Sequence, residues 1–351
     1  MKRAVILFNL GGPDAPSAVR PFLFNLFNDP AIIDYPAPLR WLLAQIISRA
    51  RAKTAEAIYA HIGGRSPLLE LTRAQAKALE TELNKADDAT NRVFIAMRYW
   101  HPRAGQTAAE VAAFQPDEIV LLPLYPQYST TTTGSSIAEW MEAIGRWSLL
   151  ARTHMIRSYP DNAAYAAAQA DLLKQTLAQA DGAPVRILFS AHGLPQKVID
   201  AGDPYQMEIE QSAIAIAHAA GFAHPNQKMA DWTICYQSKV GPMKWLEPSL
   251  DQELARAAAD KVGVVILPIA FVSEHSETLV ELDMEYRELA EHSGVPFYIR
   301  VPALGTDPGF IGALADLVRL AEAGSASVIA GEGAAICPPA CTACGNGPLR
   351  G

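Results

Sequence analysis

Two histidines directly follow apolar runs of the chain. His192 comes after Val185–Ser190, and His275 comes after the run that ends near Ala270. Histidine titrates near neutral pH and is a common metal ligand, so either position suits proton transfer or metal binding. For the segment around His192 taken alone, a histidine that only caps a turn explains the pattern equally well.

A row of carboxylates accompanies His275. Glu277, Glu281 and Glu285 are spaced by four residues and fall near one face of an expected helix. Three stacked carboxylates repel one another unless a bound metal or a proton path compensates. A solvated acidic face is the ordinary alternative for such a row, but His275 at a strand end favours a functional interpretation.

A third group lies in the first half of the chain. Arg98 begins Arg-Tyr-Trp-His-Pro after the run Val93–Met97, and Tyr125 follows the run Glu118–Leu124 at the start of a segment rich in threonine. Aromatic rings beside arginine and hydroxyl groups suit a large flat ligand with carboxylate tails. A threonine-rich phosphate or turn segment is the alternative.

The four cysteines form a separate pattern. Cys337, Cys341 and Cys344 lie close together in a tail rich in glycine and proline, and Cys235 lies at the end of an apolar run. Clustered cysteines in a cytosolic protein bind metal more often than they form disulfides. The alternative is an inert Cys235 with Zn²⁺ or no metal in the tail.

Short apolar runs alternate with amphipathic segments along the chain. The expected strands are Ala4–Leu10, Val93–Met97, Glu118–Leu124, Val185–Ser190, Trp232–Tyr236 and Lys261–Ile269. The expected helices include Asn162–Ala180, Met207–Gly221, Asp251–Ala259, Thr278–His292 and Pro308–Ala323. This alternation predicts parallel sheets with crossover helices, which is an α/β fold whose ligands bind beyond the carboxyl ends of the strands.

The two halves of the chain resemble each other. The segment from Ile6 to Pro13 parallels that from Ile187 to Pro195, so we expect two similar domains. We place them at residues 1–155 and 156–325, with residues 326–351 as a C-terminal extension. The first turn lacks G-x-G-x-x-G, which gives no support for a dinucleotide site.

Bulk properties exclude several classes of protein. The net charge is −8 and no long basic tract is present, so a nucleic-acid partner is not expected. Asn9 and Pro13 end the first apolar run too early for a signal peptide, and no run is long enough to span a bilayer. We expect a soluble, cytoplasmic protein.

Eight motifs in order resemble the ferrochelatase family and cover residues 1 to about 325. They are Asn9–Pro13, Ile62–Pro67, Arg98–Pro102, Tyr125–Ser136, Ser190–Pro195, Gly202–Tyr205, Tyr236–Pro242 with Trp245, and Leu267–Tyr286. The resemblance implies two Rossmann-like domains with parallel four-stranded sheets and a porphyrin cleft between them. It implies an enzyme that inserts Fe²⁺ into protoporphyrin IX to give protohaem.

The resemblance also implies roles for individual residues. His192 and Glu277 become the catalytic pair that meets the iron substrate, with His275, Glu281 and Glu285 as a proton or metal relay. The implied porphyrin contacts are Leu10, Ser66, Arg98, Tyr125 and Trp245.

Some members of the family carry a [2Fe–2S] cluster with three ligands in a C-terminal extension, which match Cys337, Cys341 and Cys344 here. Where animal-type members have the fourth ligand, this chain has Thr130, so we predict Cys235 as the fourth.

The apolar segment 31–43 matches the family's lip over the cleft, and Arg40, Arg49, Arg51 and Lys53 would suit contact with anionic lipid. An ordinary amphipathic core helix is the alternative for this segment.

Other functions fit the same motifs less fully. A related chelatase would insert iron into coproporphyrin or cobalt into a sirohydrochlorin, and a porphyrin-binding protein would use the site without turnover. The acidic row beside the histidines favours the enzyme, because a binding protein has no need of a proton path.

Overall fold

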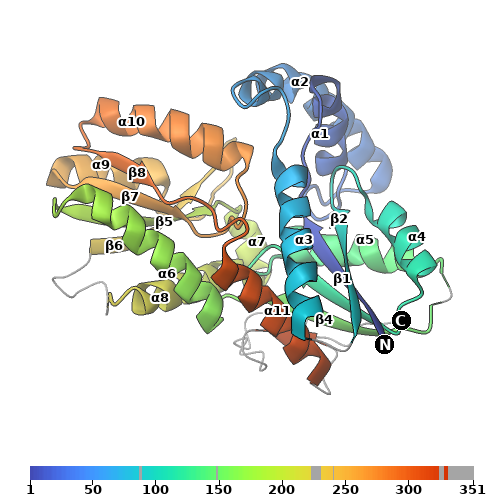
Figure 1. Ribbon diagram of the computed structural model, residues 1–351. Helices are drawn as coiled ribbons and strands as arrows, with labels where there is room; N and C mark the ends of the chain where they lie inside the picture. Colours follow the sequence, from blue (N-terminus) through green and yellow to red (C-terminus); the bar gives the residue numbers. More distant parts are fainter. Residues whose placement is uncertain (87–88, 148, 223–230, 240, 324–327, 331–351) are drawn as a thin grey trace. The chain divides into compact units, whose positions relative to one another are not determined.

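The computed structural model describes residues 1–86, 89–147, 149–222, 231–239, 241–323 and 328–330, which form two compact units (Figure 1). Among the described residues, the first unit contains Met1–Ser158, Leu314–Ala323 and Val328–Ala330, and the second contains Tyr159–Ala313. The division expected from the sequence placed residues up to 325 in the second domain. The chain instead returns to the first unit, because strand β9 (Val328–Ala330) pairs with β4 (Arg152–Ser158).

The elements of the first unit follow one another in this order: β1 (Lys2–Asn9), η1 (Pro16–Ala18), α1 (Val19–Phe27), α2 (Ala37–Ala60), α3 (Leu68–Ala86), β2 (Thr90–Met97), α4 (Ala104–Phe114), β3 (Glu118–Pro123), η2 (Thr130–Gly134), α5 (Ser135–Ile144) and β4. Those of the second are α6 (Ala163–Leu177), η3 (Ala178–Ala180), β5 (Val185–His192), α7 (Gln196–Asp200), α8 (Tyr205–Ala219), β6 (Asp231–Gln237), α9 (Leu250–Asp260), β7 (Gly263–Pro268), η4 (Glu277–Glu285), α10 (Tyr286–Ser293), β8 (Tyr298–Arg300) and α11 (Pro308–Ala323), which runs on into the first unit.

The two sheets share one strand order. Within the described residues the first sheet runs β2-β1-β3-β4-β9 and the second runs β6-β5-β7-β8, with parallel pairing throughout. β5 therefore occupies in its sheet the place that β1 occupies in the other. The predicted α/β fold with two similar domains is confirmed, and the short strand β9 adds a fifth strand to the first sheet.

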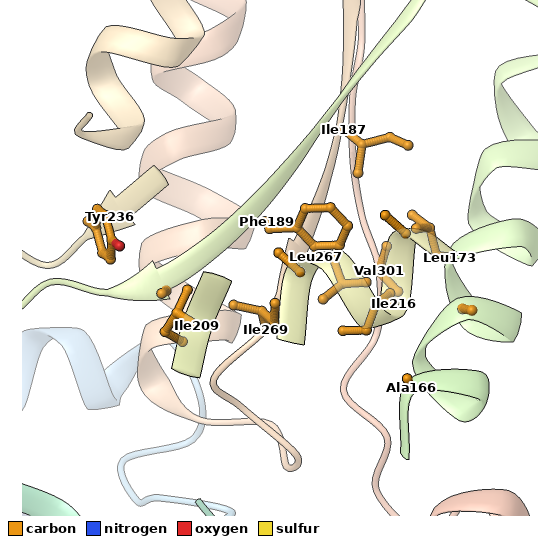
Figure 2. Packing of buried hydrophobic residues seen from close by; sticks show 14 of the residues in the cluster. Ala166, Leu173, Ile187, Phe189, Ile209, Ile216, Tyr236, Leu267, Ile269 and Val301 are labelled. Atoms are coloured by element: carbon orange, nitrogen blue, oxygen red, sulfur yellow. The ribbon is translucent and has the colours of Figure 1, made fainter. Parts of the chain in front are cut away.

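Alternate residues along the strands of the second sheet pack into two hydrophobic cores, one on each face of the sheet. Ile187 and Phe189 of β5 and Leu267 of β7 pack with α6 and α8 on one face, as Figure 2 shows. Leu188 and Ile266 pack with α9 and α10 on the other face. A sheet covered on both faces explains why these strands read as continuous apolar runs rather than as alternating ones.

The predicted helix Thr278–His292 divides into two kinds of helix. Glu277–Glu285 forms the π-helix η4, and only Tyr286–Ser293 continues as the α-helix α10. π-helical turns are rare and often lie at functional sites, because neighbouring structure must stabilise them. Residue spacing alone could not distinguish the two helix types.

Candidate active site

His192 is the last residue of the central strand β5, at the carboxyl end of the second sheet. The next residue is glycine because the backbone passes close to the end of β6. Gly193 donates its N–H to the Gln237 carbonyl at 2.8 Å, and a Cβ on Gly193 would lie only 2.8 Å from the same oxygen. The close packing of these two strand ends fixes the base of the His192 side chain.

Glu277 meets His192 from the first residue of η4. His192 Nδ1 and Glu277 Oε2 are 2.9 Å apart, and the two side chains are 39% and 24% exposed. An Nδ1–H that donates to the carboxylate leaves Nε2 of a neutral imidazole as an acceptor. The structure therefore brings together the two residues that the sequence predicted as the catalytic pair.

The two charges shift each other's protonation. Burial lowers the pKa of His192, but the charge and hydrogen bond of Glu277 and the charge of Glu281 outweigh it, so the pKa is raised. Burial raises the pKa of Glu277, but the His192 charge, its hydrogen bond and the His275 charge prevail and hold this pKa below its usual value. Opposite charges at hydrogen-bond distance favour the ionised form of both groups.

Glu281 lies four residues after Glu277 on η4, and Ser238, which follows β6, binds its carboxylate. Ser238 donates its backbone N–H to Glu281 Oε1 at 2.8 Å and its hydroxyl to Oε2 at 2.6 Å. Burial and the charge of Glu277 nevertheless raise the pKa of Glu281 to about 7, against the opposing effect of Ser238. A carboxyl group with this pKa takes up and releases protons near neutral pH.

The other two predicted relay residues differ in their surroundings. His275 is 6% exposed, and burial lowers its pKa, an effect that the charge of Glu277 only partly opposes. Its ring stacks on Phe271 with centroids 6.1 Å apart. Glu285 is exposed at the last residue of η4. Among the described residues, no group of three or more histidine, cysteine or acidic side chains is placed to hold a metal ion.

The predicted porphyrin contacts of the first unit lie beyond the carboxyl ends of its strands. Leu10 follows β1 and packs against the core cluster that contains Phe22 and Tyr99, and Ser66 is buried against the turn at Gly12. Tyr125 follows β3, with its hydroxyl buried near Ser136, and burial raises its pKa. In the second unit, Trp245 is buried against Gly193.

Arg98 forms internal ion pairs that the sequence did not predict. Its guanidinium lies 2.9 Å from Asp29 and 3.3 Å from Glu139, and its Nε donates to Ser135 Oγ at 2.6 Å. Asp29 is 3% exposed and also accepts a hydrogen bond from the Tyr99 hydroxyl at 2.7 Å. Arg98 is thus already neutralised by carboxylates of its own unit.

Sequence reasoning also missed the residues that hold the acidic row. Ser238 binds Glu281 from the left-handed backbone region, with φ of 64°, which is uncommon outside glycine. It lies in the stretch Tyr236–Pro242 that carried the family resemblance, and that stretch was the available signal. Asp29 and Glu139 lie far from Arg98 in the sequence, and no sequence pattern marked them as its partners.

Cys235 lies within an apolar core. It is fully buried on β6 among Leu188, Leu250 and Leu254, and burial raises the pKa of its thiol. A cluster ligand must be a thiolate. The tail cysteines Cys337, Cys341 and Cys344 lie outside the described residues.

Comparisons with known proteins identify the family of the chain. A sequence profile of the ferrochelatase family matches residues 2–322. The chain is 56% identical to a ferrochelatase of Phenylobacterium zucineum, over 99% of each chain, and 55% identical to one of Caulobacter vibrioides, over 91% of this chain and 90% of that one.

Solved structures show the same fold at low sequence identity. The sirohydrochlorin chelatase SirB of Bacillus subtilis subspecies spizizenii, in complex with cobalt, is 12% identical with a TM-score of 0.51, covering 92% of this chain and 96% of that one. With the family profile spanning nearly the whole sequence and relatives more than half identical to it, the chain belongs to the ferrochelatase family, the enzymes that insert iron into porphyrin.

Proposed function

We propose that His192 accepts a pyrrole proton while Fe²⁺ enters protoporphyrin IX to form protohaem, and that Glu277 passes on the proton or the metal. Insertion of Fe²⁺ releases two pyrrole protons, so the site needs a base and an exit. The contact of 2.9 Å between His192 and Glu277 carries the proposal, because it orients the ring with Nε2 as the acceptor. Glu281, with a pKa of about 7, would exchange protons with solvent.

Anaerobic incubation of the enzyme with Fe²⁺ and each candidate tetrapyrrole tests the substrate. We expect the fluorescence of protoporphyrin IX to fall with turnover and the product to be protohaem. Faster metallation of coproporphyrin, or cobalt insertion into a sirohydrochlorin, would change the assigned substrate. Tight porphyrin binding without metallation would support a binding protein instead.

The macrocycle contacts are proposed from the sequence as Leu10, Ser66, Tyr125 and Trp245, together with Arg98. Because Asp29 and Glu139 neutralise Arg98, a carboxylate of the ligand would bind Arg98 only by displacing one of them. Substitution of Tyr125 by phenylalanine should raise the KM for porphyrin if its hydroxyl contacts the ligand, and leave KM unchanged if it contacts only Ser136.

The tail cysteines are proposed as ligands of a [2Fe–2S] cluster. The alignment with the Phenylobacterium enzyme covers 99% of this chain, so it reaches into this tail. Cys235, as it lies in the structure, does not fit the role of fourth ligand, since its thiol is enclosed by apolar side chains. Cys341→Ser should abolish the visible absorption of the cluster, and retention of that absorption would end the proposal. Loss of the absorption in Cys235→Ser would restore the predicted ligand set, whereas retention would assign the fourth ligand elsewhere.

The start of α2 is proposed as a contact with anionic membrane. Leu39, Leu42 and Ile46 lie on one helical face and are 44%, 49% and 54% exposed. Exposed basic residues follow on the same helix, at Arg49, Arg51 and Lys53. No helix among the described residues has the length and apolar character needed to cross a bilayer.

Co-sedimentation with vesicles tests this contact. We expect binding to vesicles that contain phosphatidylserine, weaker binding after Leu42→Asp, and no change after Ile214→Asp on α8, where the side chain is similarly exposed. Equal binding by both variants would contradict the proposal. We propose a cytoplasmic enzyme that binds reversibly to the inner face of the membrane.

A further inference from the structure

Arg300, at the end of edge strand β8, has a buried guanidinium that holds two carboxylates. Its Nε and one terminal nitrogen donate to the two oxygens of Asp283, each at 2.7 Å. The other terminal nitrogen donates to Glu274 at 3.1 Å, and the side chain is 9% exposed. A two-pronged arginine–carboxylate pair has a defined geometry as well as strength.

The two carboxylates lie on either side of Glu277 in the sequence. Glu274 precedes it by three residues and Asp283 follows it by six, within η4. Glu274 also accepts hydrogen bonds from Thr278 Oγ1 at 2.6 Å and from the backbone of Ala303 at 3.0 Å. The backbone N–H of His275 donates to the same threonine oxygen at 2.9 Å. One guanidinium therefore connects to both ends of the segment that presents Glu277.

β8 holds η4 at a further point. The Tyr298 hydroxyl donates to the Leu282 carbonyl at 2.9 Å, and Arg287 donates to the carbonyls of Asp283 and Tyr298 at 3.0 and 2.9 Å. β8 lies at one edge of the sheet, whereas β5 and β6 lie on the other side of β7. η4 is thus held by β8 through Asp283 and by β5 and β6 through Glu277 and Glu281.

We propose that Arg300 is a positioning residue for the His192–Glu277 pair. A π-helix needs support from its neighbours, and the bonds from Arg300 fix both the entry to η4 and its middle. Loss of the guanidinium would remove the link between Asp283 and Glu274 and let Glu277 move away from His192. Displacement of a catalytic group by about 1 Å lowers turnover on the order of 100-fold.

Arg186 provides a matched control in the same unit. It is also a buried arginine, 8% exposed, that donates to two carboxylates, Asp231 at 2.7 Å and Asp260 at 2.8 Å. It lies six residues before His192 on β5, toward the opposite end of that parallel strand. Removal of Arg186 should weaken the unit without changing the geometry of the pair.

The experiment compares Arg300→Met with Arg186→Met in the full-length enzyme. We expect both to lower the melting temperature, and only Arg300→Met to lower kcat, on the order of 100-fold with the porphyrin KM within about threefold of wild type. Arg300→Lys should recover part of the lost kcat because it keeps the charge. A kcat for Arg300→Met within about threefold of wild type, or an equal fall for Arg186→Met, would overturn the proposal.

Two further measurements keep the test decisive. If Arg300→Met does not fold, Asp283→Asn removes the charge of the partner while keeping its shape, and the same fall in kcat is expected. The inference rests on the proposed role of His192, so His192→Ala is assayed beside these variants. Full turnover in His192→Ala would refute that role itself, whereas loss there with normal kcat in the Arg300 and Asp283 variants would refute only the positioning by Arg300.

Discussion

The carboxyl ends of the two sheets carry charged clusters that differ in the balance between basic and acidic side chains. In the first unit Arg98 and Arg103 pair with Asp29 and Glu139, so two cations meet two carboxylates. In the second unit Glu277 contacts His192 and also feels the charge of the buried His275, and Glu281 accepts hydrogen bonds from the uncharged donors of Ser238. The strand order around the two clusters is the same.

The two clusters differ in their suitability for proton transfer. A balanced set of ion pairs stabilises one arrangement of its side chains. In the second cluster Glu277 and Glu281 raise the pKa of His192 against the effect of its burial. Burial and the charge of Glu277 raise the pKa of Glu281 to about 7, which suits proton transfer near neutral pH. We therefore propose that the first cluster stabilises the fold and that the second carries out proton transfer.

Removal of the histidine should have the largest effect. His192→Ala is expected to lower kcat by about 10²–10⁴-fold, the usual contribution of a general base, while circular dichroism and the melting temperature stay near wild type. His218→Ala, on the exposed face of α8 in the same unit, is the control and should keep full activity. Comparable activity in both variants would remove the contrast between the two clusters.

Disruption of the balanced cluster should affect stability instead. Asp29→Ala leaves the Arg98 guanidinium without its buried partner and should lower the free energy of unfolding by about 3 kcal/mol. Urea denaturation measures this change, and Glu142→Ala, which removes an exposed ion pair with Arg146, should change it by less than about 1 kcal/mol. A normal unfolding free energy for Asp29→Ala would show that the first cluster is not structural.

Much of the fold could be predicted because its strands are buried on both faces. The apolar runs predicted β1, β2, β3, β5, β6 and β7 within a few residues, and the similarity between the halves predicted two similar domains. β4 and β8 escaped notice because they contain charged and polar residues, as in Arg152–Ser158. The three-residue strand β9 is too short for any pattern.

Only part of the candidate site could be predicted from the sequence. The spacing of Glu277 and Glu281 placed both on one face, and the structure brings one to His192 and the other to Ser238. The π-helical turn, the binding of Arg98 by Asp29, and the support from Arg300 all depend on contacts between distant residues. Such contacts leave no local spacing for a single sequence to reveal.

Substitution of Ser238, which binds the Glu281 carboxylate, should have a smaller effect. Ser238→Ala removes one hydrogen bond to the carboxylate, so the pKa of Glu281 should rise above its value of about 7 by about one unit. The ¹³C chemical shift of labelled glutamate, followed against pH, reports this change. An unchanged or lower pKa would mean that the Ser238 hydroxyl does not stabilise the ionised form.

The most direct test of the unbalanced cluster is the pKa of His192 itself, followed by ¹⁵N NMR of labelled histidine in the wild type and in Glu277→Gln. We expect a wild-type pKa above the ordinary value of about 6.5, and a clear fall in the variant, where burial acts without the charge and hydrogen bond of Glu277. A wild-type pKa at or below about 6.5 that does not respond to Glu277→Gln would contradict this expectation.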